Sequence, residues 1–517
     1  MTRLRLLTAA ALLCAALPSA AVASPSQESM FQDDPQLVYG APEQVEQTLD
    51  RLAALGVDRL RISVFWQLVA PDDQSARKPA FDAADPAAYP PRNWERYDRL
   101  VRGAKARGIG VNFNLTSPIP RWAASESPRE DIQKTFGPSA SEFGQFVRAV
   151  GTRYSGTYAG LPRVDYWSVW NEPNQAGWLT PQWSNDPRDP KRQIEVAPHT
   201  YRGLVAAAHT ALADTGHGTD TFLIGETAPK GQQDKRGITQ SIDPLRFLRS
   251  VYCLDNNLQF FRGTSAEVRG CPQSEPAKTL VAQNPGLFRS TGYAHHPYEL
   301  LLAPTRESSA PDWVTIADLG DLSRELRRIY QRYGQAMPER RGVPLYLTEY
   351  GYQTKPDPLS VSFARQAAYI NQSDYIAFRN PLVRAVSQFL LVDDAPVPGV
   401  DPRKNPRDAY LTFQSGLRTL GGKPKPSQRA YRTPLHVVDA RIRPGARARV
   451  FGQVRPARAA QRERVRIQWR RKGSKRWRTL ATRTVSGPQH FLNVRLRVPA
   501  SGALRLRWQD GRRPVVS

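Results

Sequence analysis

Two glutamates stand where a buried strand gives way to a loop, a setting in which a carboxyl group can do chemistry. Glu172 lies in the run VDYWSVWNEPN (164–174), whose β-branched and aromatic residues predict a strand that Pro173 cannot continue. Glu349 lies in VPLYLTEYG (343–351), again after an apolar strand. Barrels of parallel strands keep their chemistry at the carboxyl ends of the strands, so we expect one site assembled from both residues. Paired carboxylates are the reacting groups in cleavage of glycosidic bonds.

Two further charged residues occupy neighbouring predicted strands. Arg61 lies in the strand predicted for residues 57–66, and period-two alternation places it on one face with Ser63 and Phe65. Two interpretations stay open: Arg61 holds Glu349, or it is a salt-bridged arginine of the barrel. Glu226 ends another predicted strand and is a candidate for substrate contact, with a supporting role favoured over a third catalytic one.

The pair His295 and His296 raises the question of a metal. Adjacent residues on a strand point to opposite faces, so the two rings are not expected to share an ion. No cluster of Cys, His and carboxylate residues completes a site, and we predict neither a metal nor an organic cofactor. Three tryptophans follow predicted strands, namely Trp66, Trp122 and Trp178. As a group they are expected to include a platform for a sugar ring, although each alone is equally compatible with the core.

Strands and helices alternate through most of the chain. Strands are predicted for residues 36–40, 57–66, 109–116, the first half of 164–174, 221–226, 287–296, 345–349 and 383–392. Helices are predicted for residues 42–55, 93–107, 141–154, 199–214, 244–254, 316–333 and 363–378. This repeat predicts an α/β protein with a closed (β/α)8 TIM barrel over residues 36–434. A doubly wound open sheet is disfavoured, because no glycine-rich phosphate loop follows the first strand.

The last part of the chain, residues 435–517, changes to period-two alternation and predicts an antiparallel β-sandwich. Apolar residues alternate with arginines in residues 464–469, 492–498 and 504–508. The net charge of the chain is +26, and about +19 of it lies in this domain. The arginines are interpreted as a solvated sheet face or, alternatively, as a surface for an anionic cell-wall polymer. Nucleic-acid binding is disfavoured, since no recognised nucleic-acid fold presents the charge.

The N-terminus predicts export. Arg3 and Arg5, an apolar run and Ala21-Val22-Ala23 follow in the order of a secretory signal, with cleavage after residue 23. The apolar run is too short for an ordinary membrane-spanning helix, and no later segment is long and apolar enough, so we expect a secreted protein without a membrane span. The two cysteines outside the signal, Cys253 and Cys271, are expected to form one disulfide.

The motifs collected so far resemble those of the retaining clan A glycoside hydrolases. Trp170-Asn171-Glu172-Pro173 is similar to the clan's acid/base motif, and Thr348-Glu349-Tyr350-Gly351 to its nucleophile motif. Within the clan the chain looks most similar to the β-xylosidase and α-iduronidase family (family 39) and the cellulase family (family 5). The resemblance implies a (β/α)8 barrel with these glutamates after its fourth and seventh strands.

The same resemblance implies individual roles. Glu349 would be the nucleophile and Glu172 the acid/base, while Asn171 would bond the 2-hydroxyl of the sugar. His296 and Tyr298 match a His-Pro-Tyr form of the clan, which implies that Tyr298 bonds Glu349. The last strand departs from the pattern: Gln388 or Phe389 stands where many relatives carry a tryptophan, so the sugar is left open.

The sequence therefore predicts a secreted retaining glycosidase that acts on a polysaccharide or glycoside. The alternative is a carbohydrate-binding or cell-wall adhesion protein whose barrel has lost its activity. The presence of both glutamates, the asparagine and the His-Pro-Tyr disfavours that alternative.

Overall fold

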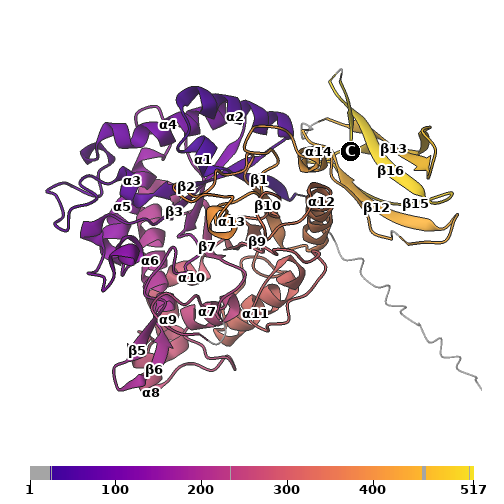
Figure 1. The fold of residues 1–517 in the computed structure, drawn as a ribbon. Coiled ribbons are helices and arrows are strands. Elements are labelled where there is room, and N and C mark those ends of the chain that lie inside the picture. The colour runs from indigo at the N-terminus through magenta and orange to yellow at the C-terminus, as the bar shows by residue number, and fades with distance from the viewer. Residues whose placement is uncertain (1–23, 25, 233–234, 440, 457–460, 512) are drawn as a thin grey trace, which may run out of the picture.

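Eight parallel strands close into a barrel in the described part of the computed structural model (Figure 1). The structure describes residues 24, 26–232, 235–439, 441–456, 461–511 and 513–517, so the predicted signal at residues 1–23 lies outside it. The barrel strands are β1 (Glu28–Gln32), β2 (Arg59–Phe65), β3 (Gly110–Thr116), β4 (Tyr166–Val169), β7 (Thr221–Thr227), β8 (Gly292–His295), β9 (Leu345–Leu347) and β10 (Val383–Phe389). They follow one another around the barrel in chain order, and β1 closes it against β10. The predicted TIM barrel is confirmed.

The first strand is the main correction. The strand predicted at residues 36–40 is wrong, because helix α1 (Asp34–Leu37) and a turn occupy that segment and β1 lies before residue 36. The side chain of Asp33 caps α1 by accepting a hydrogen bond from the backbone N–H of Gln36, and Pro35 lies in the first turn. Both features begin a helix and disfavour a strand.

The helices outside the barrel follow the predicted alternation closely. The longer ones are α2 (Pro42–Leu55), α4 (Pro91–Ala106), α5 (Ala140–Arg153), α6 (Ala197–Leu212), α7 (Pro244–Val251), α9 (Pro276–Gln283), α11 (Leu319–Arg332) and α12 (Phe363–Arg379). The short ones are α3 (Trp66–Val69), α8 (Gly263–Glu267), α10 (Pro285–Phe288), α13 (Pro406–Ala409) and α14 (Pro426–Arg432). Helix α10 occupies the first part of the strand predicted at residues 287–296, which begins at Gly292 instead. No helix in the described residues is long and apolar enough to cross a bilayer.

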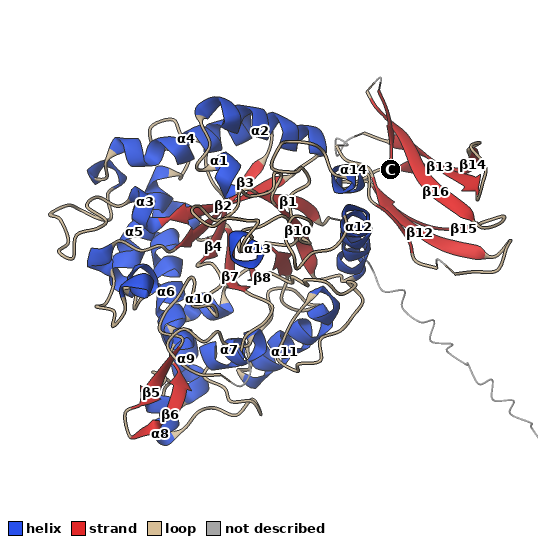
Figure 2. Cartoon of the chain, viewed as in Figure 1, coloured by secondary structure: helices blue, strands red, loops and turns tan. Residues whose placement is uncertain are grey.

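Two excursions of the chain extend from the barrel. The hairpin of β5 (Trp183–Asp186) and β6 (Asp189–Glu195) projects from the loop after β4 and was not predicted (Figure 2). The expected disulfide between Cys253 and Cys271 is confirmed, and it closes the excursion that carries α8. Both of its cysteines are buried.

The C-terminal region forms two antiparallel sheets. One has the order β11 (Leu435–Val437), β12 (Arg447–Gln453), β15 (Phe491–Arg497). The other has the order β14 (Arg478–Val485), β13 (Glu463–Arg471), β16 (Gly502–Asp510), β17 (Arg513–Val516). Figure 1 shows the sandwich beside α12 and α14, with β12 near α12. The ring of Phe378 on α12 lies 5.0 Å from that of Phe451 and 4.7 Å from that of Phe491, so the first sheet is packed against the barrel.

Candidate active site

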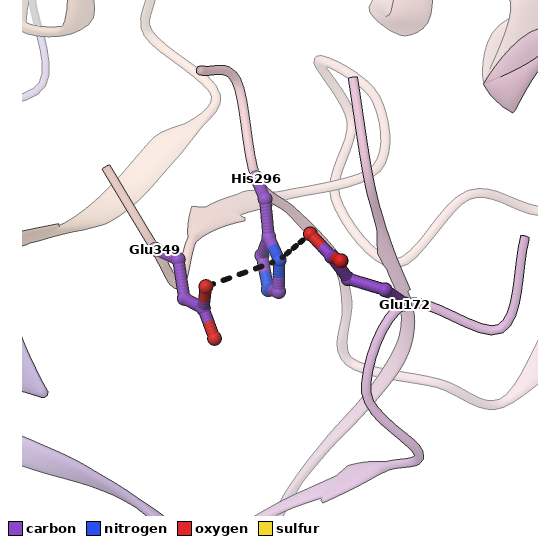
Figure 3. A group of neighbouring side chains, drawn as sticks. All are labelled: Glu172, His296 and Glu349. Carbon is purple, nitrogen blue, oxygen red and sulfur yellow. Dashed lines mark hydrogen bonds and ion pairs between the residues drawn. The ribbon is translucent and has the colours of Figure 1, made fainter. Parts of the chain in front are cut away.

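Glu172 and Glu349 face each other at the carboxyl end of the barrel. They follow the fourth and seventh barrel strands, β4 and β9, and one carboxylate oxygen of each lies within 4.8 Å of the other. Figure 3 shows the two side chains on either side of His296. Both line a cavity of about 410 Å³, and their side chains are 19% and 9% exposed. The strand ends thus bring together two residues that are far apart in the sequence.

His296, directly after β8, bridges the carboxylates. Its Nδ1 lies 2.9 Å from Oε1 of Glu172 and 3.6 Å from Oε2 of Glu349, and its Nε2 lies 2.7 Å from Oε2 of Glu226. Burial lowers the pKa of His296, but the three carboxylates outweigh burial and raise it to about 9. At neutral pH the ring is therefore an imidazolium that donates from both nitrogens.

Arg61 joins the same network from inside the barrel. Its side chain is fully buried, and its Nη1 lies 2.7 Å from Oε1 of Glu349 while its Nη2 lies 3.0 Å from Oε2 of Glu226. Arg61 is therefore both a salt-bridged barrel arginine and the group that holds Glu349. The two interpretations left open by the sequence describe one arrangement.

Glu226 has no access to a substrate. Its side chain is completely buried at the end of β7, and it does not line the cavity. Burial raises the pKa of Glu226, but Arg61 and His296 outweigh that effect and lower it to about 2. The hydroxyl of Thr348 also donates to its Oε2, at 2.7 Å. The structure thus places Glu226 outside the cavity, where it is ionised at neutral pH and contacts Arg61 and His296, in line with a supporting position rather than substrate contact.

The carboxylate of Glu349 accepts hydrogen bonds at both oxygens. Arg61 donates to Oε1, and the hydroxyl of Tyr298 donates to Oε2 at 3.1 Å, the contact expected from the His-Pro-Tyr sequence. Burial raises the pKa of Glu349, while His296 and Arg61 pull it down, and the net direction is upward. Burial also raises the pKa of Tyr298 well above its usual range, so the phenol stays a neutral donor.

Asn171 is fixed by its neighbours and lines the cavity. Its Oδ1 accepts from Nη2 of Arg61 at 2.6 Å, and its backbone N–H donates to Oγ1 of Thr116 at 2.9 Å. Because the oxygen faces Arg61, the amide NH₂ is the group left for a ligand. No hydrogen bond from that NH₂ to another described residue is formed.

The backbone at the strand ends is in an unusual conformation. Trp170, Glu172 and Glu226 have φ values of 63°, 37° and 48°, in the left-handed region that non-glycine residues rarely adopt. Each such residue costs about 1–3 kcal/mol and persists only where the surroundings hold it. The backbone N–H of Glu172 donates to the carbonyl of Glu226 at 2.9 Å, and the indole of Trp170 donates to the carbonyl of Trp178 at 2.9 Å. These bonds fix the direction of Glu172.

Of the three tryptophans, Trp178 lines the cavity. Trp66 is fully buried and stacks on Phe146 at 5.4 Å between ring centroids, so it belongs to the core. Trp122 packs edge-on against Trp66 at 6.0 Å and donates its indole N–H to the carbonyl of Pro71. Trp66 and Trp122 do not line the cavity, so within the group Trp178 is the tryptophan placed for a sugar contact.

Several cavity residues were missed by the sequence analysis. Gln32 ends β1 and Asp34 begins α1. Gln32 accepts from Nη1 of Arg61 at 2.5 Å, and Asp34 accepts from the backbone N–H of Ser63 at 3.2 Å. The sequence FQDD at residues 31–34 combines a strand end with polar residues, but the first strand was predicted at residues 36–40, after this segment. Further cavity residues are Tyr39, Glu299, Leu300, Gln353, Asp394, Phe413 and Ser415.

Phe389, on the last barrel strand, lines the cavity where relatives are expected to carry a tryptophan. Its ring packs edge-on against Tyr298 at 6.2 Å and against Phe413 at 5.0 Å. Gln388 is turned away, and its side-chain amide donates to the carbonyls of Phe389 and Ser415. Phe389 rather than Gln388 therefore forms this wall.

Glu172, His296 and Glu349 also form a group that is close enough to share a cation. Their hydrogen bonds argue against that use. Both ring nitrogens of His296 already contact carboxylates, and as an imidazolium the ring has no lone pair to offer. The donor set at neutral pH is that of a hydrogen-bonded acid–base network.

No family model and no curated protein matches the chain. Among solved structures, a family 39 glycoside hydrolase from Bacteroides cellulosilyticus WH2 is similar, with 13% identity, a TM-score of 0.48 and coverage of 93% of this chain and 81% of that one. A β-xylosidase from Caulobacter crescentus CB15 has 17% identity, a TM-score of 0.45 and coverage of 94% and 96%. GH5_18 from Streptomyces cattleya has 17% identity, a TM-score of 0.46 and coverage of 79% of both chains. Families 39 and 5 are also those that the motifs resemble, but at these scores the likeness alone assigns no activity.

Proposed function

We propose that the chain is a retaining glycoside hydrolase with Glu349 as nucleophile and Glu172 as acid/base. One observation carries the proposal: carboxylate oxygens of the two residues lie within 4.8 Å of each other across a cavity. Retaining enzymes place their carboxyl groups about 5–5.5 Å apart, whereas inverting enzymes leave about 6.5–9.5 Å for a water molecule. The spacing supports double displacement.

In the first step, an oxygen of Glu349 attacks the anomeric carbon while Glu172 gives its proton to the leaving oxygen. The glycosidic C–O bond breaks, the alcohol leaves, and a glycosyl ester of Glu349 forms. In the second step, Glu172 takes a proton from water, whose oxygen attacks the same carbon and releases Glu349. The sugar leaves with its original anomeric configuration.

The hydrogen bonds of the site support this division of roles. Arg61 and Tyr298 both donate to Glu349, as a nucleophilic carboxylate requires. His296 donates to Oε1 of Glu172, which leaves Oε2 to carry the transferable proton. The amide of Asn171 is placed to donate to a hydroxyl of the sugar, where such bonds strengthen in the transition state.

Azide rescue tests the assignment. We expect Glu349→Gly to lower kcat on an activated aryl glycoside by more than about 10⁴-fold, because no ester can form. Azide should then restore turnover and yield a glycosyl azide of inverted configuration. In the matched variant Glu172→Ala, azide should instead attack the glycosyl ester and yield the azide of retained configuration.

Rescue with inverted product in both variants, or in neither, would show that the roles are misassigned. The second candidate is a carbohydrate-binding protein without activity. It would be favoured by a wild-type protein that binds sugars but turns over no member of a broad panel of activated glycosides.

We also propose that the protein is secreted and that its substrate is a glycoside or polysaccharide. The signal-like residues 1–23 and the Cys253–Cys271 disulfide support export. We propose a catalytic domain that begins with β1 and extends to residue 434, followed by a basic domain over residues 435–517 with an anionic polymer as its partner.

A further inference from the structure

The sheet β14–β13–β16–β17 presents arginines on its outer side. Strand alternation turns Val465, Ile467 and Leu506 into the sandwich core, where they are fully buried. The residues between them point outward. Among the described residues of this sheet, the outward arginines are Arg464, Arg466, Arg470, Arg505 and Arg507, called here the arginine face.

The charges of the arginine face are not neutralised within the described part of the chain. Arg466 lies directly opposite Arg507 in the β13–β16 register, and like charges in that position destabilise a sheet. The two acidic residues of these strands, Glu463 and Asp510, share the alternation of the inward residues, and Asp510 pairs with Arg432. No ion pair joins a described carboxylate to the arginine face.

Burial and the neighbouring charges of Arg507 and Arg470 lower the pKa of Arg505. The guanidiniums therefore repel one another in the free protein. A partner that brings negative charge would relieve this repulsion.

A tryptophan lies within the arginine face. The guanidinium carbons of Arg505 and Arg470 lie 4.2 Å and 5.0 Å from the ring centroid of Trp477, which is partly exposed. The amide of Gln468 donates to the hydroxyl of Thr479 and accepts from Nε of Arg505 at 2.9 Å, so it holds this guanidinium in place. This surface combines groups that bind acidic sugars. The guanidiniums can donate two hydrogen bonds to a carboxylate or sulfate, and the aromatic ring can stack on a sugar ring.

The alternative interpretation is that these arginines form a solvated sheet face and bind no partner. Arginines without a carboxylate partner also occur elsewhere among the described residues, for example Arg92 and Arg102 on α4, whereas the mostly buried Arg153 and Arg249 are paired with carboxylates. The opposite sheet of the sandwich is covered in part by α12, through Phe451 and Phe491. The arginine face is distinguished by clustering: its five arginines, none paired with a described carboxylate, lie on the adjacent strands β13 and β16, with Arg466 directly opposite Arg507.

We propose that the arginine face binds an anionic polysaccharide and so holds the barrel near its substrate. The partner is a polymer because the charges extend along two strands, over residues 464–470 and 505–507, rather than around one cavity. It is assigned to the carbohydrates rather than to nucleic acids because Trp477 is flanked by guanidiniums and amides on a sheet, and because the barrel is proposed to act on glycosides.

Affinity electrophoresis of the full-length protein in gels containing polygalacturonate tests the proposal. We expect the wild type to be retarded by polygalacturonate at low salt, with no retardation by neutral dextran. The double variant Arg466→Gln/Arg507→Gln should lose at least about fivefold in affinity. The matched control Arg92→Gln/Arg102→Gln, which removes the same charge from exposed positions of α4, should stay within about twofold of the wild type.

Two more measurements keep the outcome decisive. Thermal unfolding should show that the Arg466→Gln/Arg507→Gln variant is at least as stable as the wild type, because cross-strand repulsion is removed. Trp477→Ala should also weaken retardation, although it removes no charge.

The proposal is overturned if the wild type is not retarded, if the face and control variants lose affinity equally, or if duplex DNA or phosphatidylglycerol vesicles are bound more tightly than polygalacturonate. Because none of these variants touches the barrel cavity, failure here leaves the azide experiment unaffected.

Discussion

At the scale of single residues, the site is a balance of five charged groups. Two cations, Arg61 and His296, lie among three carboxyl groups, Glu172, Glu226 and Glu349. Arg61 and His296 lower the pKa of Glu226 to about 2, so this carboxyl group is ionised at neutral pH. Two cations cannot neutralise three carboxylates. The pKa of Glu349 is accordingly raised, first by burial and also by the neighbouring carboxylates of Glu172 and Glu226.

The upward shift of Glu349 predicts an unusual acid limb. Because burial raises the pKa of Glu349 above 4.5, the nucleophile should become protonated, and activity lost, at a higher pH than for an ordinary glutamate. The measurement is kcat/KM against pH on an activated aryl glycoside that needs little acid assistance. Tyr298→Phe, which removes a hydrogen bond to the carboxylate, should move the acid limb further upward. An acid limb at or below pH 4.5 in the wild type would contradict this prediction.

His296 predicts a loss of stability in alkali. Its pKa of about 9 in the folded protein lies above the ordinary value of 6.5, so its stabilising contribution is complete below pH 6.5 and is lost as the pH rises through 9. The difference corresponds to about 3 kcal/mol. Urea unfolding at pH 6 and pH 9.5 should show this loss in the wild type and a smaller one in His296→Gln. Equal losses in the two proteins would exclude His296 as the cause.

At the scale of elements, the site is made by strand ends and by the loops that follow them. The segments that directly follow β4, β8 and β9 each carry one member of the Glu172, His296, Glu349 group, and β2 carries the fully buried Arg61. The loops decide which aromatic rings reach the cavity. The loop after β4 turns Trp178 inward, whereas α3 turns Trp66 into the core.

Paired substitutions of these tryptophans should separate the two environments. Trp66→Ala should lower the free energy of unfolding by about 3–5 kcal/mol, because a fully buried ring leaves a void. Trp178→Ala should leave thermal unfolding nearly unchanged and lower kcat/KM about tenfold, or about 1.4 kcal/mol of binding. A Trp66→Ala variant with unchanged stability and weakened substrate binding would contradict this prediction, because it would indicate that the sugar contacts Trp66.

At the scale of the whole molecule, positive and negative charge are separated. The net charge is +26 and is concentrated in the C-terminal domain, yet five carboxyl residues line the cavity. They are Asp34, Glu172, Glu299, Glu349 and Asp394. No Lys, Arg or His is among the described residues that line it. The surface that attracts anions is therefore remote from the surface that is proposed to bind the cleaved sugar.

This separation predicts the charge of the cleaved sugar. A uronic acid would bring its carboxylate among like charges, and the nearby cations Arg61 and His296 are already paired with the three glutamates, so we expect a neutral sugar to be preferred. In whichever anomeric series is hydrolysed, kcat/KM for an aryl glucuronide should be about 100-fold lower than for the aryl glucoside or xyloside, or about 2.7 kcal/mol. A glucuronide that is cleaved as fast as the neutral glycosides would contradict this expectation.

The sequence by itself determined the barrel, most of its helices and the two glutamates that face each other at its carboxyl end. Strand–helix alternation and the local forms around Glu172 and Glu349 depend on short-range chemistry: β-branched runs, helix caps, and proline or glycine at strand ends. The helix predicted at residues 42–55 has those bounds in the structure, since its apolar spacing and the left-handed Gly56 both act locally. The same alternation also suits an open doubly wound sheet, and the sequence favoured the barrel because no glycine-rich phosphate loop follows the first strand.

Tertiary structure alone decided which groups share the cavity. The segment QLVYG (36–40) has strand-forming residues, but Asp33 and Pro35 start a helix there, and β10 and β2 accept residues 28–32 between them instead. Glu226 and Trp66 have residue types suited to sugar contact, yet burial against Arg61 and Phe146 removes them from it. Side-chain burial depends on contacts between segments far apart in the chain, and no local pattern encodes them.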